Sequence, residues 1–331
     1  MARSPWSVVV PLFASMLALA ACSAEVPAEE QADPELAIEG EQNSEEALTQ
    51  VQNIRGADKM DPREIALTYD DGPRAHSVAF AQWLKDQGIR ATFFMTGSAV
   101  VSNAETRAAP AKIAAMGHLI ANHTYTHPIT PPFAKLSALK MVEEIYKTDQ
   151  LIAEHIEQGA PSLMRTSGGS WSSTVSATLN GNPQTRHYIG NIYWDIGGDM
   201  ANGYGADWAC WGSRYNLTPE QCGDRYLKEI RAKGKGIVLM HDIHVKSQAM
   251  TKYMVPKLVA EGYKFVRMDE IRGIRAEGTA GAAGVVAGAT CADGCLWSAS
   301  CVGSPHPRNA PGSANLVCVQ RGNCSAACTP R

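Results

Sequence analysis

Two adjacent carboxylates, Asp70 and Asp71, stand at the end of an apolar run and directly before Gly72 and Pro73. The run at 64–67 is typical of a buried strand, and the Gly-Pro pair indicates a loop after it. Successive residues of an extended chain point in opposite directions, so the two acids need not do the same work. One can bind a metal ion while the other meets a water molecule on that ion. A solvated turn is the alternative, because Asp before Gly and Pro is ordinary turn chemistry.

Two histidines, His123 and His127, follow a second short apolar run at 117–122. Residues four apart fall on one face of a helical turn and can bind one cation together. Imidazole combined with the carboxylate of Asp71 suits zinc or a similar divalent ion. Two unrelated surface histidines are the alternative reading of this spacing.

At these two stretches the chain resembles a known family. Thr68-Tyr69-Asp70-Asp71-Gly72-Pro73 and His123-Thr124-Tyr125-Thr126-His127 resemble the first two motifs of the polysaccharide deacetylases, carbohydrate esterase family 4 with the NodB homology domain. The resemblance extends from Asp61 to Ile274. It implies a metal-dependent hydrolase that removes N-acetyl groups from a polysaccharide. It also implies an irregular barrel with seven strands.

Apolar runs and helical patterns alternate along residues 61–275, which we interpret as the catalytic domain. Strands are expected at 64–68, 91–95, 118–122, 162–165, 188–195, 236–240 and 263–267, and helices at 77–87, 105–116, 136–157 and 250–260. This alternation predicts an α/β fold with a parallel sheet. In a closed (β/α) barrel the carboxyl ends of all strands open on one face, whereas an open doubly wound sheet would gather fewer of them. The barrel therefore brings together the polar residues that follow the runs, which are Asp70, Asp71, His123, His127, Arg165, Asp195 and His241.

The chemistry expected of these residues is the hydrolysis of an amide. Asp71, His123 and His127 would bind the cation, which lowers the pKa of bound water, and Asp70 would take the proton as that water attacks. His241 lies in Leu239-Met240-His241-Asp242, which resembles the fifth motif of the family. The resemblance makes His241 the general acid for the departing amine. It also makes Leu239 a wall of the pocket for the acetyl methyl group, although a plain core role fits Leu239 equally well.

The third motif departs from the family pattern. Arg165 is kept, and the resemblance would have it hold Asp70. Gly168 stands where the family has an aromatic residue whose backbone N–H helps to stabilise the oxyanion, and a Gly-Gly pair is less preorganised. We expect Trp171 to supply the missing wall.

The fourth motif is also altered, because Met200 stands where Trp is expected. Asp195 is predicted to orient Arg165 or His241, with Asp199 as the second choice and Asp207-Trp208 as a displaced alternative. Tyr125 and Trp208 complete the expected substrate contacts.

The composition limits the classes of partner that the chain can bind. It has 331 residues, a net charge of -3 and few clustered Lys or Arg residues, which argues against nucleic-acid binding. We expect a monomer whose partner is an N-acetylated glycan.

The two ends carry their own signals. Residues 1–22 resemble a bacterial lipoprotein signal peptide with lipidation at Cys22, and plain secretion is the alternative. Residues 23–60 are rich in acids and are interpreted as a disordered tether. We therefore expect an exported protein of the bacterial cell envelope, attached to a membrane through its lipid.

The remaining eight of nine cysteines suit an oxidising compartment. Cys210 and Cys222 are expected to pair. Residues 276–290 form an Ala/Gly-rich linker, and residues 291–331 form a small disulfide-rich module with six cysteines. A zinc knuckle is the alternative for this module, and its role as a glycan binder, a cap or a spacer stays open.

The function expected from the sequence is N-deacetylation of peptidoglycan, of a chitin-type glycan or of an exopolysaccharide. The cofactor is a divalent metal, with Zn²⁺ preferred and Co²⁺ or another divalent ion as alternatives. The competing functions are an O-acetyl esterase of the xylan type and a glycan-binding protein with weakened catalysis.

Overall fold

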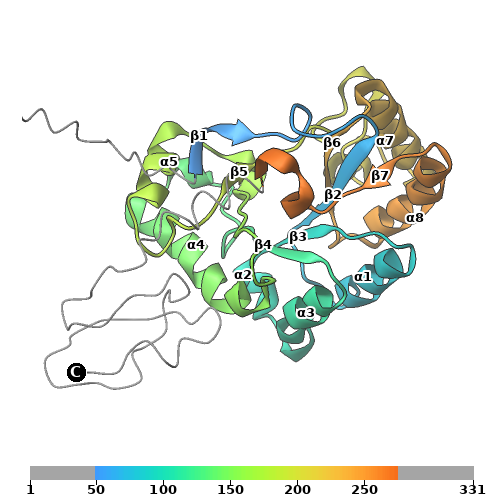
Figure 1. Cartoon of the computed structure of the whole chain (residues 1–331). Coiled ribbons are helices and arrows are strands. Elements are labelled where there is room, and N and C mark those ends of the chain that lie inside the picture. The colour runs from blue at the N-terminus through green and yellow to red at the C-terminus, as the bar shows by residue number, and fades with distance from the viewer. Residues whose placement is uncertain (1–48, 275–331) are drawn as a thin grey trace, which may run out of the picture. The chain divides into compact units, whose positions relative to one another are not determined.

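Parallel strands surrounded by helices make up the part of the chain that the structure, a computed structural model, describes, which is residues 49–274 (Figure 1). Five strands form one sheet in the order β4-β3-β2-β6, with β7 also paired to β2. Every strand pair in it is parallel. The strands are β2 (Glu64–Asp70), β3 (Thr92–Met95), β4 (Leu119–Asn122), β6 (Gly236–His241) and β7 (Lys264–Phe265). The predicted α/β fold with a parallel sheet is confirmed.

A second sheet consists of β1 (Thr49–Ile54) and β5 (Gly190–Ile192), which are also parallel. Isolated bridges continue the pairing between the sheets, from Asn122 to Met164 and from Leu163 to Ile189. The strand expected at 162–165 is present only as these bridges. A further bridge joins Ile196 to Val238 of β6. Closure into a seven-stranded barrel stays a prediction.

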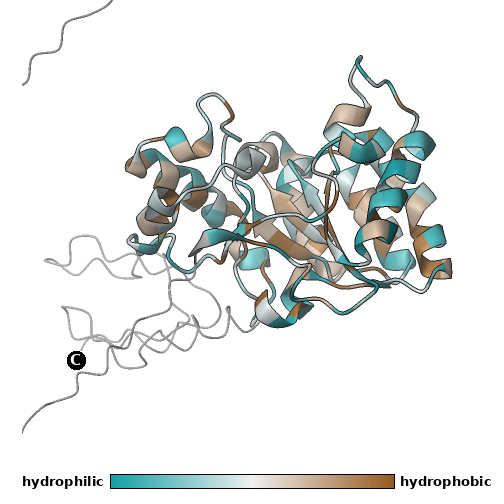
Figure 2. Ribbon diagram, turned by 90° about the horizontal axis from the view of Figure 1, so that it is seen from above, coloured by the Kyte–Doolittle hydropathy of each residue, from teal (hydrophilic) through white to brown (hydrophobic). Residues whose placement is uncertain are grey.

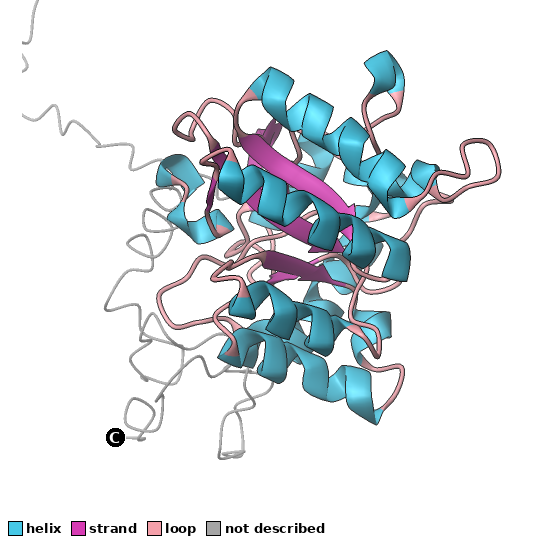
Figure 3. Ribbon diagram, turned by 90° about the vertical axis from the view of Figure 1, so that its right-hand side faces the viewer, coloured by secondary structure: helices cyan, strands magenta, loops and turns pink. Residues whose placement is uncertain are grey.

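The helices lie outside the strands (Figure 3). They are α1 (Ser77–Asp86), α2 (Gly97–Val100), α3 (Ala104–Ala115), α4 (Ala138–Ile152), α5 (Ser173–Asn180), α6 (Asp207–Cys210), α7 (Pro219–Lys233) and α8 (Val245–Ala260). Short 3₁₀ helices cover Phe133–Lys135, Ala153–His155, Ser167–Gly169, Ala201–Gly203 and Met268–Glu270.

The alternation of side chains along β2 separates the core from the site. Leu67 and Tyr69 pack in the cluster that includes the α1 residue Phe80, so this face of the strand meets the helices. Ala66 packs in a different cluster on the other face. Because side chains alternate along a strand, Thr68 and Asp70 share the face of Ala66 and point away from the helices. Figure 2 shows the apolar strands in the middle of the more polar helices.

The carboxyl-terminal part of the tether expected at 23–60 is folded. Residues 49–54 form β1, and Ile54 and Met60 are buried in the second cluster. The cluster of acidic residues ends at Glu46, so the uncharged, alternating stretch at 49–54 can pair with β5 and bury side chains. The described fold therefore includes twelve residues, 49–60, that the sequence pattern assigned to the tether.

The other expectations for the two ends fall outside the described residues. These are the signal peptide with Cys22, the acidic part of the tether, the Ala/Gly-rich linker and the Cys-rich module. Within residues 49–274, no helix combines the length and the apolar character needed to cross a membrane.

Candidate active site

Asp71, His123 and His127, predicted as metal ligands, lie together at the ends of β2 and β4. The Oδ1 atom of Asp71 is 3.3 Å from Nε2 of His123 and 3.1 Å from Nε2 of His127. That oxygen is buried and has no hydrogen-bond partner. Three such donor atoms within 4.8 Å of one another fit a divalent cation, with positions left over for water or substrate. Burial opposes ionisation of Asp71, but the adjacent His123 holds the pKa of the carboxyl well below its usual range.

A backbone carbonyl orients the first histidine. Nδ1 of His123 lies 2.7 Å from the carbonyl oxygen of Arg165 and donates to it, because a carbonyl can only accept. In the neutral ring Nε2 then carries the lone pair, and this is the atom that faces Asp71. Such a partner for the second ring nitrogen fixes the tautomer and the orientation of a metal-binding histidine.

The backbone at the site takes a conformation that side chains rarely adopt. Asp71, Thr124 and His127 have φ angles of 71°, 67° and 56°. They account for three of the six non-glycine residues with positive φ in residues 49–274. Such angles persist only where surrounding contacts hold them, and they concentrate at functional sites.

Glu144 of α4 supplies contacts to the loop between the two histidines. Its Oε2 accepts the backbone N–H groups of Tyr125 (2.9 Å) and Thr126 (2.7 Å), and its Oε1 accepts the Thr126 hydroxyl (2.7 Å). The side-chain oxygen of Asn122 also accepts the backbone N–H of Thr124 at 2.9 Å. In the sequence, the only signal of Glu144 is its place on a helix that follows the second histidine.

Asp70 is held by Arg165, as the resemblance implied. The Arg165 side chain is 0% exposed, and its Nη1 donates to Oδ1 of Asp70 (2.6 Å) and to the hydroxyl of Thr68 (2.9 Å). Its Nε donates to the carbonyl of Ile192, and its guanidinium carbon lies 4.1 Å from the centre of the Phe94 ring. With Oδ1 engaged, Oδ2 is the free oxygen of Asp70, and it lies 3.5 Å from Nε2 of His123.

His241, at the end of β6, is oriented by Asp207. Nδ1 of His241 donates to Oδ1 of Asp207 at 2.7 Å, and the backbone N–H of His241 donates to Oδ2, also at 2.7 Å. Burial alone would lower the pKa of His241, but the Asp207 carboxylate raises it to about 10. At neutral pH the ring is therefore a cation whose Nε2 proton is available to a substrate.

Asp195, predicted to orient Arg165 or His241, bonds to neither of them. Its Oδ2 accepts the backbone N–H groups of Gly56 (3.0 Å) and Ile237 (2.8 Å). Ile237 is the second residue of β6 and His241 is the last, so they stand about 13 Å apart at the rise of a strand. Asp199, the second choice, has a different partner too, because its Oδ1 accepts the backbone N–H of Ala201 at 2.6 Å. Of the alternatives weighed in the sequence, Asp207 is the one in contact with the histidine.

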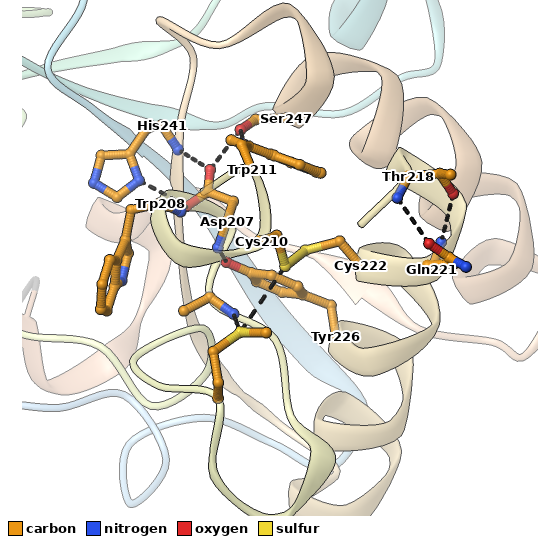
Figure 4. The surroundings of a disulfide bond; sticks show 12 residues. Asp207, Trp208, Cys210, Trp211, Thr218, Gln221, Cys222, Tyr226, His241 and Ser247 are labelled. Carbon is orange, nitrogen blue, oxygen red and sulfur yellow. Dashed lines mark hydrogen bonds and ion pairs between the residues drawn. A yellow bond between two sulfur atoms is a disulfide. The ribbon is translucent and has the colours of Figure 1, made fainter. Parts of the chain in front are cut away.

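The surroundings of Asp207 hold it firmly (Figure 4). Its Oδ2 accepts the Ser247 hydroxyl at 2.6 Å, and Ser247 in turn accepts Nε1–H of Trp211. The Tyr226 hydroxyl accepts the backbone N–H of Asp207 and donates to the carbonyl of Leu239.

A disulfide joins α6, the helix that begins at Asp207, to α7. Cys210, the last residue of α6, bonds to Cys222 of α7, so the predicted disulfide is confirmed. Cysteine spacing predicted the pair, but it carried no sign that the bond anchors the helix on which Asp207 stands.

The residues predicted to contact the substrate differ in burial and in position. Leu239 is 3% exposed and pairs in register with Thr68, so it lies on the strand face of Asp70. Trp208 is 56% exposed, and Figure 4 shows its indole on the same side of Asp207 as the His241 ring. Tyr125 is half-buried against Gly97 of α2, where an added Cβ would lie 2.3 Å from the tyrosine ring.

Two aromatic residues, Tyr193 and Trp194, fill the altered third motif in place of the expected Trp171. Trp171 packs against the cluster that contains Phe133, and Gly168 is exposed with a φ of 59°. A Cβ on Gly169 would lie 2.4 Å from the ring of Tyr193 and 3.0 Å from that of Trp194. These two rings stack with centroids 3.8 Å apart. Their bulk explains why glycine stands in this turn.

A cavity of about 270 Å³ adjoins the metal ligands. Asp71 and His127 line it, together with the hydroxyl residues Thr96, Ser98 and Thr126. It offers space for a polar substrate group next to the proposed cation.

The chain is similar to known carbohydrate deacetylases. Residues 57–185 match the polysaccharide deacetylase family. The peptidoglycan-N-acetylglucosamine deacetylase PgdA of Listeria monocytogenes is 28% identical over 216 residues, which cover 64% of this chain and 39% of that relative. The chain thus spans well under half the length of this relative.

Two further relatives cover more of their own length. The chitin deacetylase of Colletotrichum lindemuthianum is 27% identical over 227 residues, which cover 64% of this chain and 80% of the relative. Its solved structure has a TM-score of 0.53 at 23% identity and covers 67% of this chain and 90% of that one. A peptidoglycan N-acetylglucosamine deacetylase solved with 4-naphthalen-1-yl-N-oxidanyl-benzamide has a TM-score of 0.53 at 20% identity, covering 69% and 94%. Residues 57–185 are thus similar to the polysaccharide deacetylase family, and the described fold is similar to that of these two solved deacetylases.

Proposed function

We propose that this protein is a metal-dependent hydrolase that removes N-acetyl groups from the amino sugars of a polysaccharide. The observation that carries the proposal is Oδ1 of Asp71, which is buried without a hydrogen-bond partner and faces Nε2 of both His123 and His127. The buried pair of Arg165 with Asp70 and the largely buried pair of His241 with Asp207 stand beside it. Relatives named as peptidoglycan and chitin deacetylases support this class of substrate.

Asp71, His123 and His127 would hold a divalent cation, with Zn²⁺ preferred for this donor set and Co²⁺ or another divalent ion as alternatives. Such a cation polarises the acetyl carbonyl and lowers the pKa of bound water to about 7.

The protein's own groups move the protons. Asp70 takes a proton from the attacking water through Oδ2, because Oδ1 is bonded to Arg165. His241 donates its Nε2 proton to the sugar nitrogen as the bond between carbon and nitrogen breaks, which yields acetate and a free amine. Arg165 and Asp207 keep these two groups in place. Leu239 would line the pocket for the acetyl methyl group, and Tyr125 and Trp208 would contact the sugar.

The test is acetate release from chitooligosaccharides and from peptidoglycan by the purified chain. Protein stripped with a chelator is assayed before and after zinc is added back, and Asp70→Asn is the control. Release that returns with zinc and is lost in the variant supports the proposal. If zinc binds but neither substrate yields acetate, the proposal is wrong.

An O-acetyl esterase of the xylan type would use the same residues, and His241 separates the two reactions. An alkoxide is a better leaving group than an amide anion, so an ester needs less help from an acid. We expect His241→Ala to reduce amide cleavage by a larger factor than ester cleavage. Equal losses on the two substrates would contradict the role given to His241. Zinc binding without turnover of amide or ester would leave glycan binding as the function.

We also propose that the protein works in the cell envelope as a lipid-anchored monomer, through Cys22. This rests on residues 1–22, whose pattern is that of a lipoprotein signal. Labelling with a radioactive fatty acid in wild-type and Cys22→Ser cells tests it, because only the wild type should incorporate label.

A further inference from the structure

The cavity beside the metal ligands contains one basic side chain that the proposed reaction does not use. Arg74 lines this cavity together with Asp71, His127 and the three hydroxyl residues Thr96, Ser98 and Thr126. The remaining lining is apolar. Arg74 lies three residues after Asp71, on the loop that leads into α1.

The backbone of Arg74 is fixed although its side chain is exposed. Its N–H donates to the Ser77 hydroxyl at 2.8 Å, and the N–H of Ser77 donates back to the Arg74 carbonyl at 3.0 Å. Ser77 is fully buried, and its hydroxyl donates to Asp242. The guanidinium therefore extends from a rigid position at the cavity.

The charge of Arg74 is not balanced by a carboxylate within residues 49–274. The neighbouring acids have other partners, since Asp70 bonds to Arg165, Asp71 faces the two histidines and Asp242 bonds to Ser77. Two other surface arginines do have partners: Arg90 pairs with Glu270 and Arg231 with Glu261. A planar guanidinium that is free of an internal partner is well suited to bind a carboxylate through two hydrogen bonds.

We propose that Arg74 is a specificity-determining residue that binds a carboxylate of the substrate. The inference rests on the proposed function and narrows it. The preferred glycan carries a carboxylate on the sugar that loses its acetyl group or on the next one, as a lactyl ether or a uronate would provide. A neutral chitin-type glycan has hydroxyls for Thr96, Ser98 and Thr126 but no partner for Arg74.

A matched pair of substrates isolates this contact. One is an N-acetylated oligosaccharide prepared from peptidoglycan after removal of the peptides, so that the lactyl carboxylates on its sugars are free, and the other is the same oligosaccharide with those carboxylates converted to neutral amides. The zinc-loaded full chain is compared with Arg74→Gln and Arg74→Lys. Arg107→Gln, an exposed position on α3 that does not line the cavity, removes the same charge elsewhere.

The measured quantity is the ratio of kcat/KM for the charged substrate to that for the neutral one. A charge-assisted pair predicts that Arg74→Gln lowers this ratio about tenfold or more through KM, with Arg74→Lys in between and Arg107→Gln like the wild type. Salt should reduce the ratio for the wild type and leave that of Arg74→Gln nearly constant.

Two results would overturn the inference while the proposed function stands. One is a wild-type enzyme that releases acetate from both substrates with equal kcat/KM, and the other is an Arg74→Gln variant with the wild-type ratio. Absence of acetate from both substrates and from chitooligosaccharides would instead reject the proposed function and this inference together.

Discussion

Asp70 and Asp71 are neighbours in the chain and have the same side chain, yet their surroundings give them different roles. Asp70 is the last residue of β2 and is bonded to the buried Arg165. Asp71 has left the strand with a φ of 71°, which turns its carboxylate toward the two histidines. The first is a suitable base because one oxygen stays free, and the second is a suitable ligand because its inner oxygen has no other partner.

The contact between Asp207 and His241 predicts how Asp207→Asn behaves. The asparagine keeps the size of the side chain but removes the charge that raises the pKa of His241 to about 10. We expect kcat to fall by about 100-fold or more, because general acid catalysis contributes about that much. The alkaline limb of the profile of kcat against pH should move to lower pH, because the burial that remains lowers the pKa of the histidine.

The pH profile separates a positioning role from a structural one. A variant that merely folds less well would lose amplitude at every pH and keep the position of the alkaline limb. A limb at the wild-type pH would therefore contradict the role given to Asp207.

The three bonds from the loop to Glu144 predict a loss of metal affinity in Glu144→Gln. An amide oxygen cannot replace two carboxylate oxygens, so the strained loop between His123 and His127 should loosen. Removing a group that holds metal-binding residues in place typically lowers metal affinity about 10- to 100-fold. Competition for zinc against a coloured chelator measures this directly, without an assay of activity.

Glu143→Gln is the matched control for that measurement. Glu143 is the preceding residue of the same helix and pairs with Lys140 and Lys147 rather than with the loop. Equal zinc affinities in the two variants would show that Glu144 does not support the site.

At the scale of elements, the site depends on a one-turn helix that has little stability of its own. α6 spans only Asp207–Cys210, and isolated helices of this length do not persist in water. Its position comes from the hydroxyls of Ser247 and Tyr226 and from the disulfide to α7. A bond that looks structural in the sequence thus supports the orientation of His241, the proposed general acid.

Replacing both Cys210 and Cys222 with alanine should therefore affect stability and catalysis together. The bond joins residues 12 apart, and closing a loop of about that length stabilises a fold by about 3 kcal/mol. We expect a lower melting temperature and a lower kcat, with zinc affinity unchanged because Asp71, His123 and His127 lie on other elements.

The double variant keeps the six cysteines at 291–331, so it is the control for effects of reductant elsewhere in the chain. Reductant added to the wild type should reproduce the kinetics of the double variant, and it should have no further effect on the double variant. A double variant with the wild-type kcat would show that hydrogen bonds alone hold Asp207.

At the scale of the whole molecule, the parallel arrangement of β2, β4 and β6 brings the candidate residues to one place. Asp70, His123 and His241 end or follow these three strands, and parallel strands present their carboxyl ends at the same edge. The helices outside the strands bury the other face of the sheet, so the site can be polar while the fold remains stable.

The stability of this fold should fall in acid through His118, which joins α1 to the sheet. Its Nδ1 accepts the N–H of Ala91 at 3.0 Å, and its Nε2 donates to the carbonyl of Ala81 at 2.9 Å, so the ring is neutral. Burial lowers the pKa of His118 in the folded protein. Below a pH of about 6.5 the unfolded chain takes up a proton there that the folded chain does not, and stability is lost by at most about 1.4 kcal/mol per pH unit.

Urea unfolding of the wild type and of His118→Gln at pH 7.5 and pH 5.5 checks this. The variant should be less stable at pH 7.5, and the difference between the two proteins should shrink at pH 5.5. A difference that is the same at both values would show that His118 does not titrate in this way.

The sequence by itself determined the fold class, the disulfide partners and the three residues that meet in the candidate metal site. Asp71, His123 and His127 stand in short motifs whose order and spacing are specific, and Cys210 and Cys222 lie close together in one insertion. Such local patterns survive in a linear chain because the residues that act together are also near each other in it. Residues 49–54 are the exception: the sequence pattern places this uncharged stretch in a tether, but it forms β1.

Only the tertiary structure decided which residues support the candidate catalytic residues. Asp207 rather than Asp195 orients His241, Glu144 holds the histidine loop, and Tyr193 fills the turn at Gly169. Each of these contacts joins segments that are distant in the sequence or lie on different elements. Their partners depend on how strands and helices pack, because hydrogen bonds and van der Waals contacts act over a few ångströms in space and have no regular spacing along the chain.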